Sequence, residues 1–369
     1  MAKVLELGKS IDEGVRALLR FLLESGKIKG VLTLTKISRD DDVAYSLITN
    51  SELVEDTVPL YPLMPSNTAK LLTRLTLLEP MTEPIAAVVK PCELRGFIEL
   101  IKLNQGSLEN ILFISSTCGG VYSLKTAEKG NVGEKLPQYW ESIKKMEVPP
   151  DVRPTCKGCK YFLPYSADIT VDLIGKEYNG KKCEILINTQ KGEEFISGME
   201  GELKEVEIPT EYIDSYRNKR LAEREKIFNE IRVEKFGLEE LINIFGKCIG
   251  CHGCRTVCPI CYCKLCYFDS RESDYKPINF ETELERKDGM RIPPDTILYQ
   301  IVRLTHISTS CVGCGMCSDI CPVDIPLSII FSMMGESVQG MFEYVPGKNV
   351  EEKMPLITFK TEEFVELEL

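Results

Sequence analysis

Residues 248–266 read CIGCHGCRTVCPICYCKLC and hold seven cysteines among nineteen residues. The first four follow the spacing C-x2-C-x2-C-x3-C-P, and residues 311–322, CVGCGMCSDICP, repeat it. In ferredoxin-type runs of this spacing, three thiolates bind one [4Fe–4S] cluster and the fourth binds the other. The paired motifs therefore predict two clusters, one held by Cys248, Cys251, Cys254 and Cys321, and the other by Cys311, Cys314, Cys317 and Cys258.

The long helical insert between the motifs indicates an all-α, helical ferredoxin domain instead of the compact β-containing type. Two zinc sites are the structural alternative, but zinc sites usually show separated C-x2-C pairs. A zinc scaffold would contain zinc instead of iron and acid-labile sulfide.

Three further thiols in the first run, Cys261, Cys263 and Cys266, exceed what two clusters need. They either pack around a cluster or, with one ligand from elsewhere, hold a further metal centre. The first interpretation is favoured, because three thiols without an evident fourth ligand do not close a site. Counting a third cluster, predicted below for the first half of the chain, an iron content near sixteen per chain instead of about twelve would reverse it.

The bulk composition is that of an ordinary globular protein, with 43% hydrophobic and 27% charged residues among 369. The formal net charge is −11 and the basic residues are scattered, which argues against nucleic acid as a partner. The chain begins without an apolar signal region, and no apolar run reaches the roughly 18 residues of a membrane span. We expect a cytoplasmic protein whose membrane contact, if any, is made through a partner. Sixteen cysteines and only two histidines favour cluster ligation over disulfides or histidine-rich sites.

The first 205 residues alternate between apolar strands, such as residues 30–37, 85–90 and 111–117, and helical segments, such as residues 11–25 and 68–78. This rhythm predicts an α/β domain with a largely parallel sheet over residues 1–205. Residues 206–245 are helical in pattern and highly charged, which is typical of an interdomain linker helix with a solvated face. Residues 246–369 form the predicted helical dicluster ferredoxin domain.

Four more cysteines are dispersed in the α/β domain. Cys92 opens a helix after a strand, Cys118 follows the next strand, and Cys156 and Cys159 form a C-x2-C pair. Because the carboxyl ends of neighbouring parallel strands lie side by side, Cys92 and Cys118 could converge, and the pair could complete a third cluster. Cys183 alternates with apolar neighbours and is expected in the core.

Much of the chain resembles the β-subunit family of coenzyme F420 hydrogenases and dehydrogenases, and within it the formate dehydrogenase β subunits of methanogens. The stretches that carry the resemblance, besides both cysteine motifs, are FLLESGKIKGVLTL (21–34), VVKPCELRGFIELIK (88–102), TCGG (117–120), TCKGCKYFLPYSADI (155–169), RIPPDTILYQIVRLTHISTSC (291–311), CPVDIPLSIIFSMM (321–334) and YVPGKNVEEKMPLITF (344–359). The resemblance implies that Cys92, Cys118, Cys156 and Cys159 bind a [4Fe–4S] cluster.

Family members commonly also bind FAD, which exchanges a hydride with F420. By this resemblance Gly14, Asp168 and Gly175 are the candidate flavin contacts. The family usually has a Gly-Gly pair where this chain has Asp12 and Glu13, and two carboxylates beside a pyrophosphate would be repulsive.

Two functions remain open. In the favoured one, the chain has no substrate of its own and relays electrons between a catalytic subunit and an acceptor. In the other, it is a flavin-containing subunit that oxidises or reduces F420. The partners implied are a formate dehydrogenase or hydrogenase catalytic subunit, or subunits of the heterodisulfide reductase type.

Overall fold

The computed structural model describes residues 2–37, 42–130, 132–207, 211–231, 237–273, 276–289 and 296–355. Parts of the predicted linker (208–210 and 232–236) and of the predicted ferredoxin domain (274–275, 290–295 and 356–369) lie outside these ranges. The described strands are β1 Ala2–Leu7, β2 Gly30–Lys36, β3 Val43–Ile48, β4 Ile85–Val88, β5 Ile111–Ser116, β6 Ile169–Val171, β7 Cys183–Ile187 and β8 Glu202–Val206.

These strands form one mixed sheet in the order β3-β2-β4-β5-β6-β7-β1-β8. Strands β2, β4, β5 and β6 pair in parallel, whereas β3, β7, β1 and β8 are joined by antiparallel pairings. The expectation of a largely parallel sheet is therefore correct only for its centre. No helix is described between β2 and β3 or between β6 and β7, and without such a crossover consecutive strands pair antiparallel. The edge strand β8 alternates between exposed and half-buried residues, which makes it a weak sequence signal.

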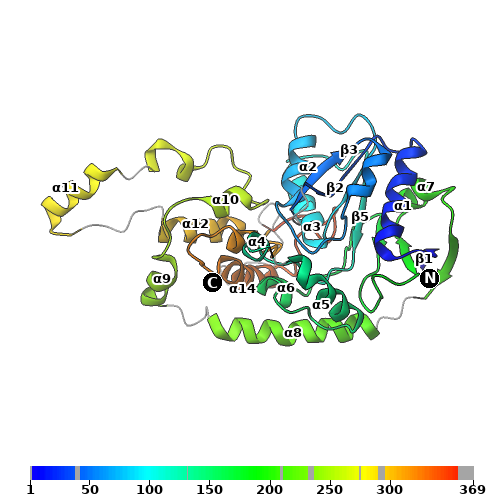
Figure 1. Ribbon diagram of the computed structural model, residues 1–369. Helices are drawn as coiled ribbons and strands as arrows, with labels where there is room; N and C mark the ends of the chain where they lie inside the picture. Colours follow the sequence, from blue (N-terminus) through cyan, green and yellow to red (C-terminus); the bar gives the residue numbers. More distant parts are fainter. Residues whose placement is uncertain are drawn as a thin grey trace, which may run out of the picture.

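Helices cover both faces of the sheet (Figure 1). The helices of this half are α1 Ile11–Glu24, η1 Ser51–Asp56, α2 Thr68–Thr76, α3 Pro91–Lys102, α4 Leu124–Glu128, α5 Val132–Lys144, α6 Pro154–Lys157 and α7 Gln190–Ile196. One apolar core joins α1, α5 and α7 to one face, and a second joins α2 and α3 to the other. Strands β4 and β5 are buried at every position, as expected for parallel strands covered on both sides.

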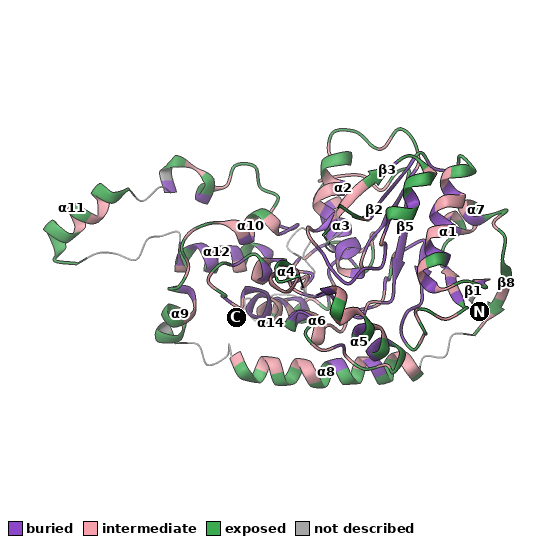
Figure 2. Cartoon of the chain, in the orientation of Figure 1, coloured by how far each residue is buried: buried purple, intermediate pink, exposed green. Residues whose placement is uncertain are grey.

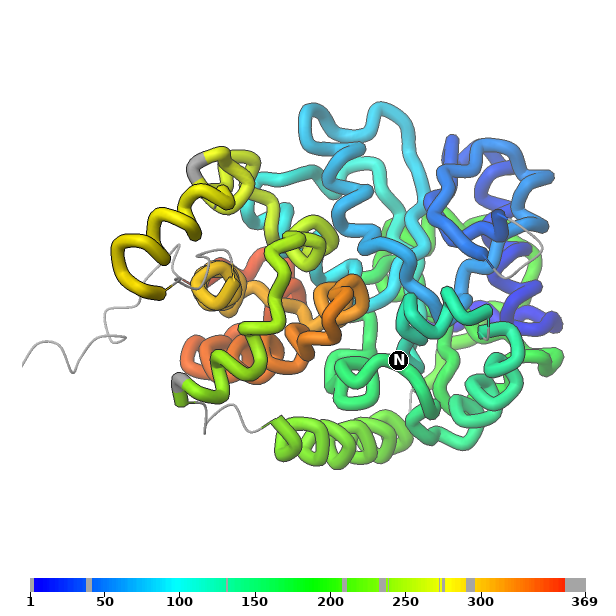
Figure 3. The backbone as a smooth tube through the Cα atoms, turned by 60° about the vertical axis from the view of Figure 1, so that its left-hand side comes forward, coloured from blue at the N-terminus to red at the C-terminus, as the bar shows by residue number. Residues whose placement is uncertain are grey.

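The remaining described elements are helical: α8 Glu211–Ile231, α9 Leu238–Phe245, α10 Gly253–Val257, η3 Tyr267–Asp269, η4 Arg271–Ser273, α11 Pro277–Lys287, α12 Ile297–Ile307, α13 Met316–Asp319 and α14 Leu327–Met341. Helix α11 extends away from the rest of the molecule and buries no residue (Figures 1 and 2). Helix α8 runs along the underside of the molecule and contacts both α6 and α14 (Figures 1 and 3). It therefore touches both the sheet-containing half and the cysteine-rich half.

Candidate metal centres

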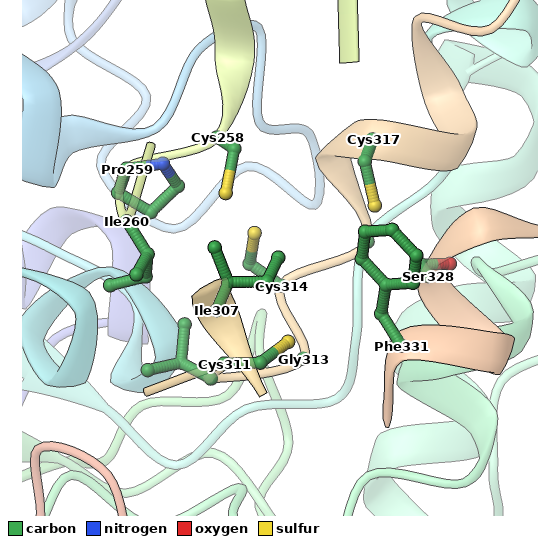
Figure 4. A pocket seen from close by; sticks show the side chains of 12 residues that line it. Cys258, Pro259, Ile260, Ile307, Cys311, Gly313, Cys314, Cys317, Ser328 and Phe331 are labelled. Carbon is green, nitrogen blue, oxygen red and sulfur yellow. The ribbon is translucent and has the colours of Figure 1, made fainter. Parts of the chain in front are cut away.

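Four cysteines of the two ferredoxin-type motifs line one cavity. Cys258 follows α10, Cys311 and Cys314 belong to the loop that enters α13, and Cys317 lies within α13. Their sulfur atoms point towards a common space in Figure 4. The rest of the wall is largely apolar and includes Pro259, Ile260, Ile307, Val312 and Phe331. Four thiols around an apolar cavity suit a [4Fe–4S] cluster, and they are the set that the spacing assigns to the second motif.

Two glycines allow the loop of the second motif to turn tightly. Gly313 and Gly315 have φ values of +67° and +85°, a conformation that residues with a Cβ rarely adopt. A Cβ on Gly315 would lie 2.6 Å from Oγ1 of Thr155, which belongs to α6 in the other half of the molecule. Gly315 thus permits both the turn and the close approach of the two halves.

The protonation of these thiols depends on their burial. Burial raises the pKa of Cys311 to about 11 and that of Cys314 to about 12, and it also raises the pKa of Cys317. The pKa of Cys258 is lowered instead, chiefly by a hydrogen bond from the thiol of Cys261. Since iron binds the thiolate, a cluster bound in this cavity would displace the protons of these thiols.

In the first-motif set, Cys254 lies within α10 and Cys321 follows α13. Cys254 and Cys321 are buried and Cys248 is half-buried, whereas Cys251 is exposed. Polar groups approach three of the sulfur atoms. Nε2 of Gln300 lies 3.6 Å from Sγ of Cys248 and 3.9 Å from Sγ of Cys254, and Oη of Tyr299 lies 3.7 Å from the same Cys254 sulfur. The backbone N–H of Ile325 donates to Sγ of Cys321 at 3.4 Å. Such contacts stabilise negative charge on sulfur.

The three extra thiols of the first run have different environments. Cys261 is half-buried and contacts Cys258, Cys266 is half-buried against the apolar core of the helical half, and Cys263 is exposed. Within the described ranges, no three His, Cys, Asp or Glu side chains come close enough to hold a single metal ion. In a cubane, by contrast, each thiolate binds a different iron, so its ligands stand further apart.

The dispersed cysteines meet beyond the carboxyl ends of β4 and β5. Cys92 lies in the first turn of α3, Cys118 follows β5, and Cys156 and Cys159 lie in and just after α6. Burial raises the pKa of Cys92 and of Cys118, and it raises that of Cys156 to about 12. Cys118 and Cys156 each add to the pKa of Cys92, and Cys159 adds to the pKa of Cys118 and of Cys156, so Cys118 and Cys156 lie near both Cys92 and Cys159.

Cys314 connects the two halves of the molecule. It packs in one small apolar cluster with Cys92 and Cys156, around buried Met64 and Met316. Charge on Cys314 also contributes to raising the pKa of Cys92, after the larger effect of burial. The cavity of the second motif is therefore adjacent to two of the dispersed cysteines, Cys92 and Cys156.

A buried ion pair fixes this junction. Arg153, which precedes α6, lies 2.6 Å from the Asp319 carboxylate of α13, and both side chains are almost fully buried. Nη1 of Arg153 also donates to the carbonyl of Cys314 at 3.1 Å, and the Asp319 carboxylate accepts from the backbone N–H of Leu124 at 3.0 Å. The junction is hydrogen-bonded on both sides, so the two halves have a defined relative position.

Residues of helix α8 contact the dispersed cysteines, and the sequence analysis did not predict these contacts. Four residues spaced four apart on this helix contact the sheet-containing half: Tyr212, Tyr216, Arg220 and Arg224. Tyr212 donates a hydrogen bond to Asp172, and Tyr216 is buried. Arg220 donates to backbone carbonyls of the cysteines, and Arg224 donates to the carbonyl of Gly158. The i, i+4 stripe of aromatic and arginine residues was the available signal. The high overall charge of α8 masked it.

The three candidate flavin contacts have different local environments. Gly14 lies in α1 against β7, where a Cβ would stand 2.6 Å from Sγ of Cys183. Asp168 precedes β6 and accepts a hydrogen bond from a β5 backbone N–H at 2.9 Å. Gly175 follows the other end of β6, next to Met146. The assignment of these residues as flavin contacts stays a prediction.

The carboxylates of Asp12 and Glu13 are used locally. Asp12 accepts a hydrogen bond from Tyr178 at 3.0 Å and pairs with Arg16 at 2.8 Å. Glu13 forms a capping box with Ser10 at the start of α1. Both residues therefore stabilise α1 and its contacts.

Comparison with known proteins identifies the family. A family model described as a 4Fe-4S dicluster domain matches residues 244–325, a span that includes all eight ferredoxin-type cysteines. The β subunit of F420-dependent formate dehydrogenase from Methanocaldococcus jannaschii is 30% identical over 364 residues, which cover 90% of this chain and 91% of that protein. The chain belongs to the family of F420-dependent formate dehydrogenase β subunits.

A second family member is the β subunit of F420-dependent formate dehydrogenase 1 from Methanococcus maripaludis. It is 28% identical over 392 residues, covering 93% of this chain and 92% of that protein. The resemblance seen in the sequence is thus confirmed over nearly the whole chain. A chain in the xenon-derivatised structure of the F420-reducing [NiFe] hydrogenase complex from Methanosarcina barkeri aligns more distantly, with 17% identity, a TM-score of 0.47, and coverage of 64% of this chain and 93% of that one.

The helices of the described ranges were also compared with the length and polarity needed to cross a bilayer. None of them is both long enough and apolar enough to do so.

Proposed function

We propose that this chain is the iron–sulfur β subunit of a multisubunit redox complex and relays electrons through three [4Fe–4S] clusters. The observation that carries the proposal is that Cys314, Cys92 and Cys156 all pack against the same small apolar cluster around Met64 and Met316. In the proposed relay, the three cysteine sets form one series, and the second-motif set stands between the other two. The dicluster domain and the formate dehydrogenase relatives support the electron-transfer role.

Twelve cysteines would hold the clusters. The outer set of the helical half consists of Cys248, Cys251, Cys254 and Cys321; the middle set consists of Cys258, Cys311, Cys314 and Cys317; and the sheet-edge set consists of Cys92, Cys118, Cys156 and Cys159. When bound, each cluster supplies reversible one-electron chemistry.

The surrounding residues prepare these sites for a buried negative charge. The apolar wall of the middle set excludes water, which strengthens electrostatic interactions inside the site. At the sheet-edge set the backbone N–H of Gly120 donates to Sγ of Cys118 at 3.3 Å, and at the outer set Gln300 and Ile325 approach sulfur. Hydrogen bonds to sulfur raise the reduction potential of a cluster. Exposed Cys251 is the point at which the outer set reaches the surface.

We propose a formate dehydrogenase catalytic subunit as the partner, because both relatives are named as subunits of that enzyme. A hydrogenase subunit and subunits of the heterodisulfide reductase type are the alternatives. Anoxic purification of the tagged chain from its own cells, with mass spectrometry of the bound proteins, tests the choice. The expected result is a formate dehydrogenase catalytic subunit at a fixed ratio; recovery of the chain alone would contradict the proposal.

The same preparation decides between electron relay and hydride exchange with F420. The relay predicts no flavin released on denaturation and about twelve iron and twelve sulfide per chain. One flavin per chain would overturn the relay and restore the alternative subunit, which exchanges a hydride with F420 through FAD. Zinc in place of iron would indicate the structural scaffold.

A further inference from the structure

Arg220 of α8 binds the backbone of the sheet-edge set directly. It is 1% exposed. Its Nη2 donates to the carbonyl of Cys118 at 2.8 Å, and its Nη1 donates to the carbonyls of Cys156 and Cys159 at 3.0 and 3.4 Å. One guanidinium therefore touches three of the four cysteines of this set, although it lies more than 60 residues further along the chain.

No carboxylate balances this buried cation among the residues that the structure describes. The ionisable groups that act most strongly on Arg220 are Tyr216, Cys159 and Cys118. Its Nη2 donates to Oη of Tyr216 at 2.8 Å, and its Nε has no hydrogen-bond partner within the described ranges. Burial of a lone charge is strongly unfavourable, so such a charge is normally paired. The negative groups available here are the cysteine sulfur atoms, once they are thiolates.

A [4Fe–4S] core held by four thiolates carries a net negative charge, and reduction adds one more electron to it. A nearby positive charge favours the reduced form, and net charge is one of the factors that set cluster potentials. From this geometry we infer that Arg220 is a positioning residue that raises the reduction potential of the sheet-edge cluster. The inference rests on the proposed cluster at this set.

Two other buried arginines provide an internal comparison. Arg303 of α12 also lacks a salt bridge among the described residues; its Nη2 donates to the carbonyl of Cys254 at 3.3 Å, and its charge acts on Cys258 and Cys317. Arg303 therefore serves the outer and middle sets. Arg153, by contrast, is already neutralised by Asp319. The effect of Arg220 should consequently be confined to one cluster.

The test is an anoxic redox titration of the full chain, with dithionite as electron donor and EPR detection of each reduced cluster. Arg220→Gln removes the charge and keeps an amide donor, Arg220→Lys keeps the charge, and Arg303→Gln is the matched control at the other sites. Arg220→Gln should lower the potential of one cluster by at least about 59 mV, a tenfold lower ratio of reduced to oxidised cluster at fixed potential. Arg220→Lys should restore most of this loss, and Arg303→Gln should lower the other potentials instead.

Each outcome bears on the inference. An unchanged potential in Arg220→Gln with all clusters present would overturn it. If Arg220→Gln loses the sheet-edge cluster, Arg220→Lys decides: retention of the cluster supports the role of charge, and loss in both variants overturns it in favour of hydrogen-bond geometry alone. Iron analysis of the wild type separates this question from the proposed function, because about eight iron per chain would mean that the sheet-edge set holds no cluster at all.

Discussion

The two halves of the molecule assemble their cysteines in different ways. In the helical half, four cysteines of each motif lie within a run of eleven residues, and left-handed glycines turn the loop so that three thiols face one cavity. In the sheet-containing half, the four cysteines come from three separate segments that meet at the ends of two parallel strands. The first kind of site is specified by spacing and the second by the fold.

The two kinds of site should respond differently to substitutions elsewhere in the chain. A site specified by the spacing of its cysteines depends on those cysteines and on the loop that carries them. A fold-encoded site depends as well on residues far away in the sequence, such as the packing of α5 and the arginine of α8. Changes remote from any cysteine should therefore affect the sheet-edge set more than the other two.

The largest effect is expected from loss of the middle set. Cys317→Ser should remove about four iron per chain and should abolish electron transfer between the outer and sheet-edge clusters, because no other described cysteine set lies between them. The measurement is the iron content, together with the rate at which the co-purified complex passes electrons to its acceptor. Undiminished transfer would mean that electrons follow another path.

The ion pair at the junction should give the next largest effect. Asp319→Asn leaves Arg153 buried without its partner, which typically costs about 3–5 kcal/mol. The loss should be smaller in the loaded protein, because the clusters supply negative charge near Arg153. Chemical denaturation of the cluster-free and loaded chains measures both values.

The matched control is Asp324→Asn, which removes an exposed partner of Lys125 and should change stability by at most about 1 kcal/mol. Equal effects of the two substitutions would contradict the structural role assigned to the junction.

A smaller effect is expected from packing beside the sheet-edge set. A Cβ on Gly119 would clash with Ile143 of α5 and lie 2.6 Å from Oη of Tyr139. Gly119→Ala should lower stability by about 1–3 kcal/mol and reduce the occupancy of the neighbouring cluster, while the other two clusters keep theirs. Gly340→Ala in α14, where a Cβ would meet no atom within 4 Å, is the control. Thermal unfolding and EPR of the three clusters distinguish the two variants.

The cysteine sites of the helical half were easier to predict from the sequence than the site of the sheet-containing half, because spacing specifies the former and the fold specifies the latter. The eight ferredoxin-type cysteines could be paired from spacing alone, and burial of Cys183 in the core followed from its alternation with apolar neighbours. The convergence of Cys92 and Cys118 could be expected only through the parallel sheet centre. The edge strands were harder to predict, since β8 is largely solvated. Arg220 was missed because a charged helix is usually solvated, and only its partners in space show that it is buried.

The smallest effect should follow substitution of an extra thiol. Cys263 is exposed, and its backbone carbonyl accepts a hydrogen bond from Arg255 at 2.7 Å. Cys263→Ser should leave iron content and all potentials unchanged. A loss of iron would support a further metal centre at Cys261, Cys263 and Cys266.

The most direct test of a fold-encoded third cluster is the iron and acid-labile sulfide content of the anoxically purified chain, compared with that of Cys118→Ser. The wild type should contain about twelve of each per chain and the variant about eight, with the EPR signals of the remaining two clusters preserved. About eight in both proteins would contradict the account, because the four cysteines at the sheet edge would then hold no cluster.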